Sequence, residues 1–309
     1  MKEYPKLTVI IPCKNAGKTI QKTFDSLRNQ KYKNFECIVM DANSTDNTMD
    51  IVEKNRDIIH TAISEDDKGG PDAANKAIKF CSGDAIGFLY ADDYLVENAL
   101  EDIANAMVDF PKNDVYSYGL SIEDLNTQKK ILESYSKKDI SLCLNNVLFK
   151  HVLNHFYRKH VFDKVGPFKV SNFKGTIFFS NDREFLLRLC LNDMKNYVIE
   201  KVLYKMTTHK ESFTGSRKNI VIIREEHIDF GNYFLKNYNL SVYKKNKLLL
   251  FVAHNLALLF VWYLITLKLK DAINIFMEGY SLRGFYWIID IIVRPLSEIR
   301  YRMSVKYWF

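Results

Sequence analysis

The stretch IGFLYADDYL, residues 86–95, is an apolar run that ends in two adjacent carboxylates, Asp92 and Asp93. A short apolar run bounded by polar residues is typical of a buried strand, and a helical pattern begins soon afterwards, near residue 96. The acidic pair is therefore expected at the tip of a strand. There it either caps the following helix or offers hard oxygen ligands to a cation such as Mg²⁺ or Mn²⁺.

Three similar runs precede this one and alternate with helical segments. We predict strands at 7–12, 35–40, 60–64 and 85–90, and helices near 20–27, 47–55, 71–80 and 96–109. This alternation predicts a Rossmann-like α/β fold with a mostly parallel sheet, in which ligands bind beyond the carboxyl ends of the strands. From about residue 114 the alternation breaks, which indicates a mixed or antiparallel extension, and a further amphipathic helix is expected at 180–193.

The composition is that of a globular protein with an uneven charge. The 309 residues are 47% hydrophobic, and the net charge is +7. Residues 241–309 hold ten Lys and Arg against four acids, a net charge of +6, interleaved with Leu, Phe, Trp and Tyr. This mixture favours an anionic lipid surface over nucleic acid as a partner. The five cysteines lack CxxC spacing and indicate reduced thiols, and the first residues do not resemble a signal peptide, so a cytoplasmic location is expected.

One alternative is a nucleotide-hydrolysing P-loop, because residues 15–19, NAGKT, follow a strand. That loop needs a glycine five residues before Gly17, where backbone N–H groups curl around phosphates. The position is Pro12, which has no N–H to offer. A dinucleotide-binding GxGxxG is also missing after the first strand.

Further acids are expected near the same edge of the sheet. Asp41 begins DANSTDNT at the end of the second predicted strand, where an Asx turn and a nucleoside contact are both compatible with the sequence. Residues 65–72 hold four acids, a crowding that a cation or a hydroxyl-rich ligand would relieve. Asp182 begins the later helix, either as its cap or as an acid that faces the site.

These pieces together resemble the family 2 glycosyltransferases of GT-A fold, which are inverting enzymes that use nucleotide-diphospho-sugars. The resemblance is to members that make bacterial cell-surface polysaccharides, and it covers roughly residues 5–215. It rests on six pieces in order: LTVIIPCKN (7–15), the helix end with Ser26, Leu27 and Gln30, VMDANSTDNT (39–48), EDDKGGPDAANKAI (65–78), SGDAIGFLYADDYL (82–95) and NDREFLLRL (181–189). It implies a glycosyltransferase domain at 1–215, followed by a helical, basic and aromatic region at 216–309. A silent nucleotide-sugar or membrane-binding module on the same fold is the main alternative, and a P-loop NTPase a weaker one.

The resemblance also implies roles for individual residues. Asp182 would be the catalytic base, Asp93 a ligand of a Mg²⁺ or Mn²⁺ ion, and His209 a further metal ligand or phosphate contact. His155 would lie near the acceptor. The donor, a UDP-sugar, would be surrounded by Pro12, Asn15, Asp41, Asp72, Asn75 and Asp92. The sugar would pass to a hydroxyl of a saccharide acceptor, one linked to a polyprenyl lipid.

The uncharged stretch at 248–267 is long enough to cross a bilayer. His254 and Asn255 lie in its middle, and lysines flank both ends, which disfavours a span. We therefore predict a helix that lies in the membrane interface or docks on the protein, with Trp262, Tyr263, Tyr286 and Trp287 at the interface. This would hold a cytoplasmic enzyme peripherally at the inner face of the cell membrane.

Overall fold

The structure is a computed structural model, and it describes residues 4–124, 127, 129–144, 147, 152–171, 175, 178–208 and 219–304. The chain divides into two compact units: residues 1–170 with 181–209, and residues 171–180 with 210–309. The domain boundary predicted at residue 215 lies outside the described residues. The short segment 171–180 belongs to the second unit, although it precedes a helix of the first.

The first unit is built on a parallel half-sheet that matches the predicted strands. Its strands are β1 (Leu7–Cys13), β2 (Phe35–Asp41), β3 (Thr61–Ser64) and β4 (Ala85–Phe88), in the order β3-β2-β1-β4. The register sets Cys13 beside Asp41 and Asp41 beside Ser64, so three strands end at one edge. Almost every residue of β1, β2 and β4 is buried, as expected of parallel strands covered on both faces, whereas the edge strand β3 is partly exposed.

A mixed extension continues the sheet past β4 in the order β8-β6-β9-β5. It consists of β5 (Tyr94–Leu95), β6 (Val115–Asp124), β7 (Lys130–Ser134), β8 (His155–Arg158) and β9 (Asn196–Thr208), with β7 paired to β6. β8 is antiparallel to β4, and β9 is parallel to β6. Gly87 of β4 makes room for the Phe156 ring, because a Cβ there would lie 2.4 Å from that ring. The mixed, mostly parallel α/β sheet confirms the predicted fold class.

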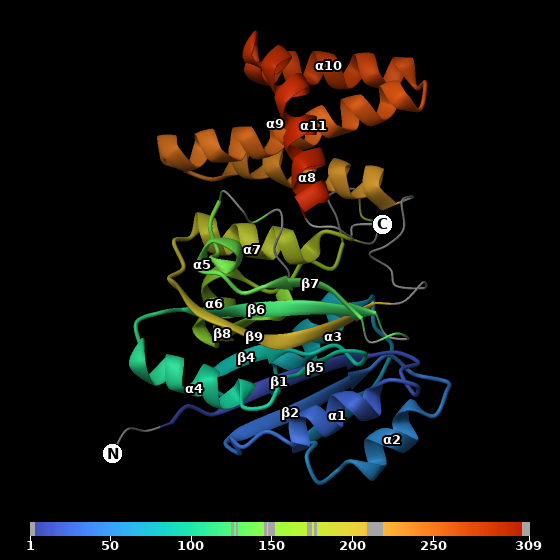
Figure 1. The fold of residues 1–309 in the computed structure, drawn as a ribbon, viewed down its shortest axis with the longest axis vertical. Coiled ribbons are helices and arrows are strands. Elements are labelled where there is room, and N and C mark those ends of the chain that lie inside the picture. Colours follow the sequence, from blue (N-terminus) through green and yellow to red (C-terminus); the bar gives the residue numbers. More distant parts are fainter. Residues whose placement is uncertain are drawn as a thin grey trace. The chain divides into compact units, whose positions relative to one another are not determined.

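Helices cover the sheet on both faces (Figure 1). They are α1 (Ile20–Arg28), α2 (Thr48–Lys54), α3 (Gly70–Ile78), α4 (Ala99–Asp109), α5 (Lys137–Ile140), α6 (His160–Val165) and α7 (Asn181–Leu191), with a short 3₁₀ helix at Val152–Asn154. Parallel crossovers are right-handed, so the reversal from β3 back to β4 sets α3 on the face opposite α1 and α2. The strand order therefore switches direction between β1 and β4, where α/β sheets bind ligands.

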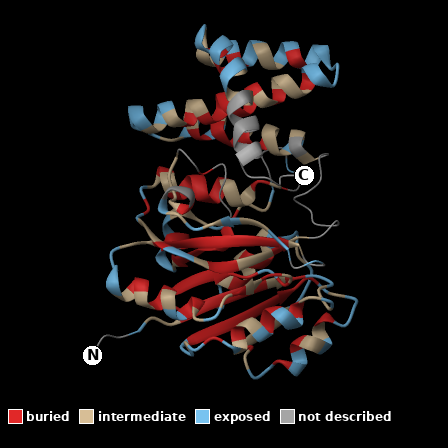
Figure 2. Ribbon diagram, viewed as in Figure 1, coloured by how far each residue is buried: buried red, intermediate tan, exposed pale blue. Residues whose placement is uncertain are grey.

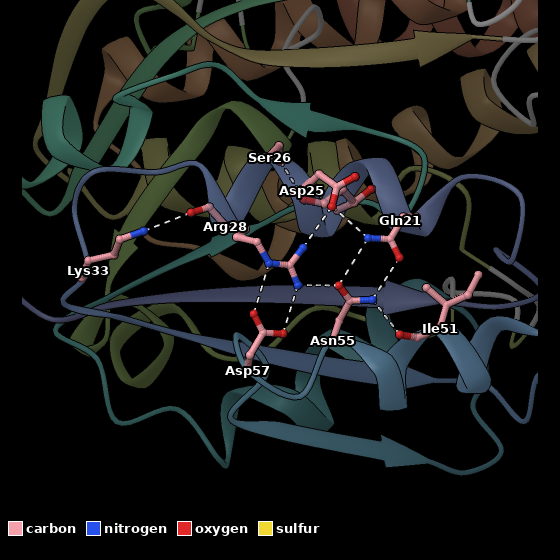
Figure 3. Close-up of polar contacts among 9 residues, drawn as sticks. Gln21, Asp25, Ser26, Arg28, Lys33, Ile51, Asn55 and Asp57 are labelled. Carbon is pink, nitrogen blue, oxygen red and sulfur yellow. Dashed lines mark hydrogen bonds and ion pairs between the residues drawn. The ribbon is translucent and has the colours of Figure 1, made fainter.

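A polar cluster joins α1 to α2 (Figure 3). Arg28 reaches both carboxylate oxygens of Asp57, at 3.1 and 3.0 Å, and donates to Asn55 at 2.7 Å. Gln21 and Asn55 exchange bonds between their amides, at 3.3 and 3.0 Å. These bonds fix α1, whose buried face of Ile20, Phe24 and Leu27 packs inward.

The second unit is helical, as predicted for the C-terminal region. It contains α8 (Asn219–Asn237), α9 (Val242–Ile265), α10 (Leu269–Arg283) and α11 (Tyr286–Ser304), and α9 packs against the other three. By length and composition alone, α9 could cross a membrane. Its polar middle is nevertheless buried within the unit, since Asn255 accepts a bond from Arg224 at 3.0 Å and contacts His227 Nδ1 at 2.9 Å. Figure 2 shows buried residues along α9 and exposed ones along α10.

Candidate active site

The loop after β1 uses its backbone N–H groups within the protein. The amides of Asn15, Ala16 and Gly17 donate to Ser44 Oγ at 2.7 Å, Thr48 Oγ1 at 2.8 Å and Asp46 Oδ2 at 3.0 Å. Asn15 adopts φ of 50°, and its side-chain oxygen accepts from the amide of Thr45 at 2.9 Å. A P-loop needs such amides free for phosphate, so this geometry opposes the P-loop alternative. Asn15 is exposed and Pro12 is partly exposed at the strand tip.

Asp41 organises the loop after β2. It is 1% exposed, and its carboxylate accepts bonds from the hydroxyl of Ser44, the amide of Ser44 at 2.9 Å and the hydroxyl of Ser64 at 2.6 Å. These protein donors hold the side chain expected to contact the nucleoside. An Asx turn lies further along the loop, where Asp46 Oδ1 accepts the amide of Thr48, two residues later, at 3.0 Å.

Asp93 points into the protein from the turn that follows β4. It is 2% exposed. One carboxylate oxygen accepts the hydroxyl hydrogen of Tyr204 at 2.6 Å, and the other accepts the amide of Thr207 at 2.7 Å. Burial, and secondly the charge of Asp92, raise the pKa of Asp93 well above its ordinary value, while these two bonds act in the opposite direction. The carboxylate is thus held by β9, a strand more than a hundred residues later.

Asp92 is the more accessible member of the pair. It is partly exposed, and its backbone carbonyl accepts from Thr207 Oγ1 at 2.8 Å. The amide of Asp93 donates to the carbonyl of Tyr90 at 3.0 Å, which closes the tight turn at the strand tip. The two neighbours therefore face different surroundings, one the interior of the sheet and the other the surface.

Asp182 lies in the first turn of α7, partly exposed. Burial raises the pKa of Tyr90, and the charges of Asp182, Asp93 and Asp92 raise it further, even though 39% of Tyr90 is exposed. All three carboxylates thus act on one phenol beyond the end of β4. The structure brings the predicted base and the acidic pair into a common electrostatic environment.

A buried ion pair that the sequence did not reveal anchors α7. Arg188 contacts Glu184 at 2.9 Å and donates to the carbonyls of Val165, Gly166 and Pro167. Arg188 is only 5% exposed, and Glu184 is fully buried. The i, i+4 spacing of an acid and an arginine was the available signal, but it does not tell a buried pair from a surface one.

Asp72 and Asn75 lie on α3 and contact protein groups. The side-chain amide of Asn75 donates to the backbone carbonyl of Phe168 at 2.8 Å, and its oxygen accepts the backbone N–H of Phe168 at 2.9 Å. Asp72 accepts from the amide of Lys68 at 3.1 Å and lies 3.6 Å from the ammonium of Lys76. Asn75 therefore links α3 to the loop after α6.

The two histidines differ from the rest of the predicted set. His155 is fully buried in β8, with Nδ1 2.6 Å from Ser117 Oγ. This geometry fits a core histidine and gives no support to a contact with the acceptor. His209 lies outside the described residues.

A hollow of about 560 Å³ lies beside α1 and is lined by Lys22, Asp25, Ser26, Asn29, Tyr94, Leu95 and Glu97. Tyr94 directly follows Asp93 in the chain, but none of the predicted site residues lines this hollow. We therefore place the site at the switch between β1 and β4, where topology and charge agree.

A mostly parallel α/β sheet with carboxylates near its switch point is a frame in which ligands bind beyond the carboxyl ends of the strands. Residues 8–181 match the model of glycosyl transferase family 2. Because the match covers more than half of the chain, the protein belongs to this family. The family match does not favour the P-loop alternative.

Two relatives illustrate the family likeness. The chain is 26% identical over 201 residues to the poly(ribitol-phosphate) beta-N-acetylglucosaminyltransferase TarP of Staphylococcus aureus, covering 63% of this chain and 60% of TarP. It is 33% identical over 162 residues to WfgD of Escherichia coli, a UDP-Glc:alpha-D-GlcNAc-diphosphoundecaprenol beta-1,3-glucosyltransferase, covering 48% of this chain and 62% of WfgD. The matches therefore span about three fifths of the length of these relatives.

Solved structures show the same fold. A fragment of Staphylococcus aureus TarS in complex with UDP-GlcNAc has a TM-score of 0.67 at 20% identity, covering 97% of this chain and 92% of that one. The mannosyltransferase PcManGT of Pyrobaculum calidifontis, in complex with GDP-Man and Mn²⁺, has a TM-score of 0.62 at 16% identity, covering 99% and 84%. The predicted GT-A fold is confirmed.

Proposed function

We propose that the protein is an inverting glycosyltransferase that moves a sugar from a UDP-sugar to a hydroxyl of a polyprenyl-linked saccharide, in the synthesis of a cell-surface glycan. The observation that carries the proposal is that the charges of Asp92, Asp93 and Asp182 all raise the pKa of Tyr90, two residues after the end of β4. These carboxylates provide both for a cation on a diphosphate and for a proton.

The relatives support the choice of substrates. WfgD is named for a UDP-glucose donor and a diphosphoundecaprenol-linked acceptor, and TarS was crystallised with UDP-GlcNAc. By analogy, the donor of this protein is a UDP-sugar, and its acceptor is lipid-linked. The residues proposed to surround the donor are Pro12, Asn15, Asp41, Asp72, Asn75 and Asp92. To contact the ligand directly, Asp41 and Asn75 would each give up a hydrogen bond to a protein group.

A divalent cation, Mg²⁺ or Mn²⁺, fits the acidic pair. Burial and the charge of Asp92 both raise the pKa of Asp93, so a cation would relieve the crowding of the two carboxylates. Each carboxylate oxygen of Asp93 accepts one hydrogen bond from β9. A carboxylate oxygen has about two acceptor positions, so each oxygen keeps one position for a metal ion. When bound, the cation would neutralise charge on the departing diphosphate.

The described residues contain no group of three or more His, Cys, Asp and Glu placed to hold a metal. Diphosphate oxygens and water would therefore complete the shell around Asp93, with Asp92 adjacent. His209, two residues after Thr207, which bonds Asp93, is a further proposed ligand. PcManGT, of the same fold, was solved with Mn²⁺.

Asp182 is the proposed base. Its carboxylate would accept the proton of the acceptor hydroxyl while the hydroxyl oxygen attacks the anomeric carbon on the face opposite the leaving diphosphate. Attack from that face inverts the configuration of the carbon. The sugar–diphosphate bond breaks as the new glycosidic bond forms, and the proton remains on Asp182.

A lipid-linked acceptor places the reaction at a membrane. The protein would work in the cytoplasm, attached peripherally to the inner face of the cell membrane through its basic C-terminal region. The net charge of +6 on residues 241–309 supports this placement.

The test is the variant Asp182→Asn. We expect turnover with a UDP-sugar and a lipid-linked acceptor to fall by about 10²-fold or more, while donor binding, followed by thermal stabilisation, is retained. The control is Asp50→Asn, which also removes an acid from the first turn of a helix, α2, and leaves activity unchanged. If both variants turn over like the parent, Asp182 is not the base, and if the parent binds donors without transferring sugar, the chain is a binding module.

A further inference from the structure

Helix α10 buries one face and exposes an apolar stripe on another. Ala272 and Gly279 are buried, and Gly279 lies so close to the Trp287 ring that a Cβ would come within 2.2 Å of it. Leu269, Ile273, Met277 and Tyr280, spaced four, four and three residues apart, are 58%, 62%, 59% and 49% exposed. Residues with this spacing share one side of a helix.

Helix α11 has the same division. Trp287 and Asp290 are buried, whereas Tyr286, Ile289, Ile292 and Val293, and Phe285 just before the helix, are all at least 46% exposed. We call the exposed apolar residues of the two helices the α10–α11 face: Leu269, Ile273, Met277, Tyr280, Phe285, Tyr286, Ile289, Ile292 and Val293. So many large apolar side chains on two adjoining helices exceed the scattered exposure of an ordinary surface.

The charges beside this face are mixed, since Asp271 and Glu278 are exposed on α10 along with Lys268 and Lys270. Asp290 on α11 is paired with Arg283 at 3.0 Å and Arg294 at 2.8 Å. The positive excess belongs to the whole segment 241–309, whose net charge is +6. The electrostatic complement of this segment is an anionic surface.

We propose that the α10–α11 face inserts into the headgroup region of a bilayer that contains anionic lipid. This assigns the membrane contact to α10 and α11, whereas the sequence indicated α9 and its flanking aromatics. Tyr263 and Trp287, expected at the interface, are 8% and 0% exposed. The proposal rests on the proposed use of a lipid-linked acceptor, which brings the enzyme to a bilayer.

Charge also decides between a bilayer and a second copy of the chain. Pairing two such faces would bring two segments of net charge +6 together, whereas anionic headgroups would offset that charge. Aromatic residues such as Tyr280, Phe285 and Tyr286, beside aliphatic ones and lysines, are the composition of a helix lying in a membrane interface.

The test uses the full chain and vesicles of phosphatidylcholine with or without phosphatidylglycerol. The double variant Ile273→Glu with Met277→Glu is compared with Phe80→Glu, a control on the first unit where the native side chain is 53% exposed. We expect the parent and the control to float with phosphatidylglycerol vesicles, and the double variant to bind them about tenfold or more weakly. All three side chains are exposed, so melting temperatures should agree.

A second variant, Lys268→Glu with Lys270→Glu, should weaken binding to phosphatidylglycerol vesicles and make the remaining binding less sensitive to salt, while leaving the apolar face intact. Unchanged flotation of the Ile273/Met277 variant would overturn the proposal. So would a parent that ignores vesicles but dimerises in solution through these residues, as sedimentation would show. The vesicle experiment contains no sugar donor, so a failure to bind vesicles leaves the proposed transferase activity untouched. Conversely, a protein that does not transfer sugar to a soluble acceptor could still bind vesicles through the α10–α11 face.

Discussion

Tyr204 of β9 donates its hydroxyl hydrogen to Asp93 over 2.6 Å. The same hydroxyl accepts the amide of Tyr90 at 3.2 Å, so one side chain holds both ends of the turn after β4. Burial raises the pKa of Tyr204, with the charge of Asp93 as the second cause, and the phenol therefore remains a donor. The direction of the Asp93 carboxylate is thus determined by a strand far away in the sequence.

The variant Tyr204→Phe removes this donor and keeps the ring. We expect the divalent-metal concentration for half-maximal transfer to rise about tenfold, the usual cost of losing a group that orients a metal ligand. Stability should fall by about 1 kcal/mol for the lost bonds. Activity measured over a range of Mn²⁺ and Mg²⁺ concentrations gives the first quantity, and urea unfolding gives the second.

The matched control is Tyr118→Phe, since Tyr118 is equally buried and donates to the carbonyl of Leu153 at 2.9 Å. It should lose similar stability without a change in metal dependence. If both variants shift the metal requirement alike, or neither does, Tyr204 does not orient a metal ligand at Asp93.

The parallel half of the fold could be predicted because it depends on local pattern. Runs such as residues 7–12 and 35–40 are mostly apolar, with Thr8 and Glu36 as their polar members, as expected of strands covered on both faces, and β1 and β2 contain those residues. Parallel pairing of these strands then predicts that Asp41 and the acidic pair lie at the same edge of the sheet, beyond the carboxyl ends of the strands. The family resemblance rested on the same ordered stretches.

The sequence could not predict the directions of side chains that depend on distant elements. The inward turn of Asp93 depends on Tyr204 and Thr207, which adjoin it only after β9 has joined the sheet. Trp287 was expected at a membrane interface, but Gly279 of α10 leaves space for its ring. Arg188 is buried because three carbonyls converge on it from one loop.

Arg188 gives the second prediction. Burial raises the pKa of Glu184, and Arg188 limits that rise, so the variant Arg188→Met leaves an uncompensated buried acid and three carbonyls without their donor. We expect a loss of about 3 kcal/mol in unfolding free energy. Turnover should also fall, because α7 carries Asp182 in its first turn. Urea unfolding and initial-rate kinetics measure the two effects.

A double-mutant cycle separates the ion pair from the contacts with the loop. Glu184→Met combined with Arg188→Met should be more stable than Arg188→Met alone, because no buried charge remains. A control on the surface is Arg56→Met, whose partner Glu53 is exposed and whose loss should matter little. An Arg188→Met protein as stable as the parent would refute the anchoring role.

Glu36 gives the third prediction, at the opposite end of the sheet from the site. Its carboxylate accepts from Thr8 Oγ1 at 2.6 Å, the amide of Ser82 at 2.6 Å and the amide of Gly83 at 3.1 Å, and lies 2.8 Å from Lys6 Nζ. Burial acts to raise the pKa of Glu36, but bonds from Lys6, Ser82 and Thr8 outweigh it and lower the pKa from 4.5 to about 2. The carboxylate joins β1 and β2 to the loop before β4.

The lowered pKa fixes the sign of the pH dependence. A group that holds its proton less tightly when folded contributes stability above its unfolded pKa, and this contribution disappears as the pH falls from about 4.5 towards 2. The variant Glu36→Gln should be about 2 kcal/mol less stable at pH 7, because its NH₂ group would face donors. Its stability should also decline less steeply between pH 4.5 and 2. The control Glu53→Gln, at an exposed ion pair, should unfold in urea like the parent across this pH range. If the stability of Glu36→Gln falls with pH in parallel with that of the parent, the lowered pKa of Glu36 does not contribute to stability.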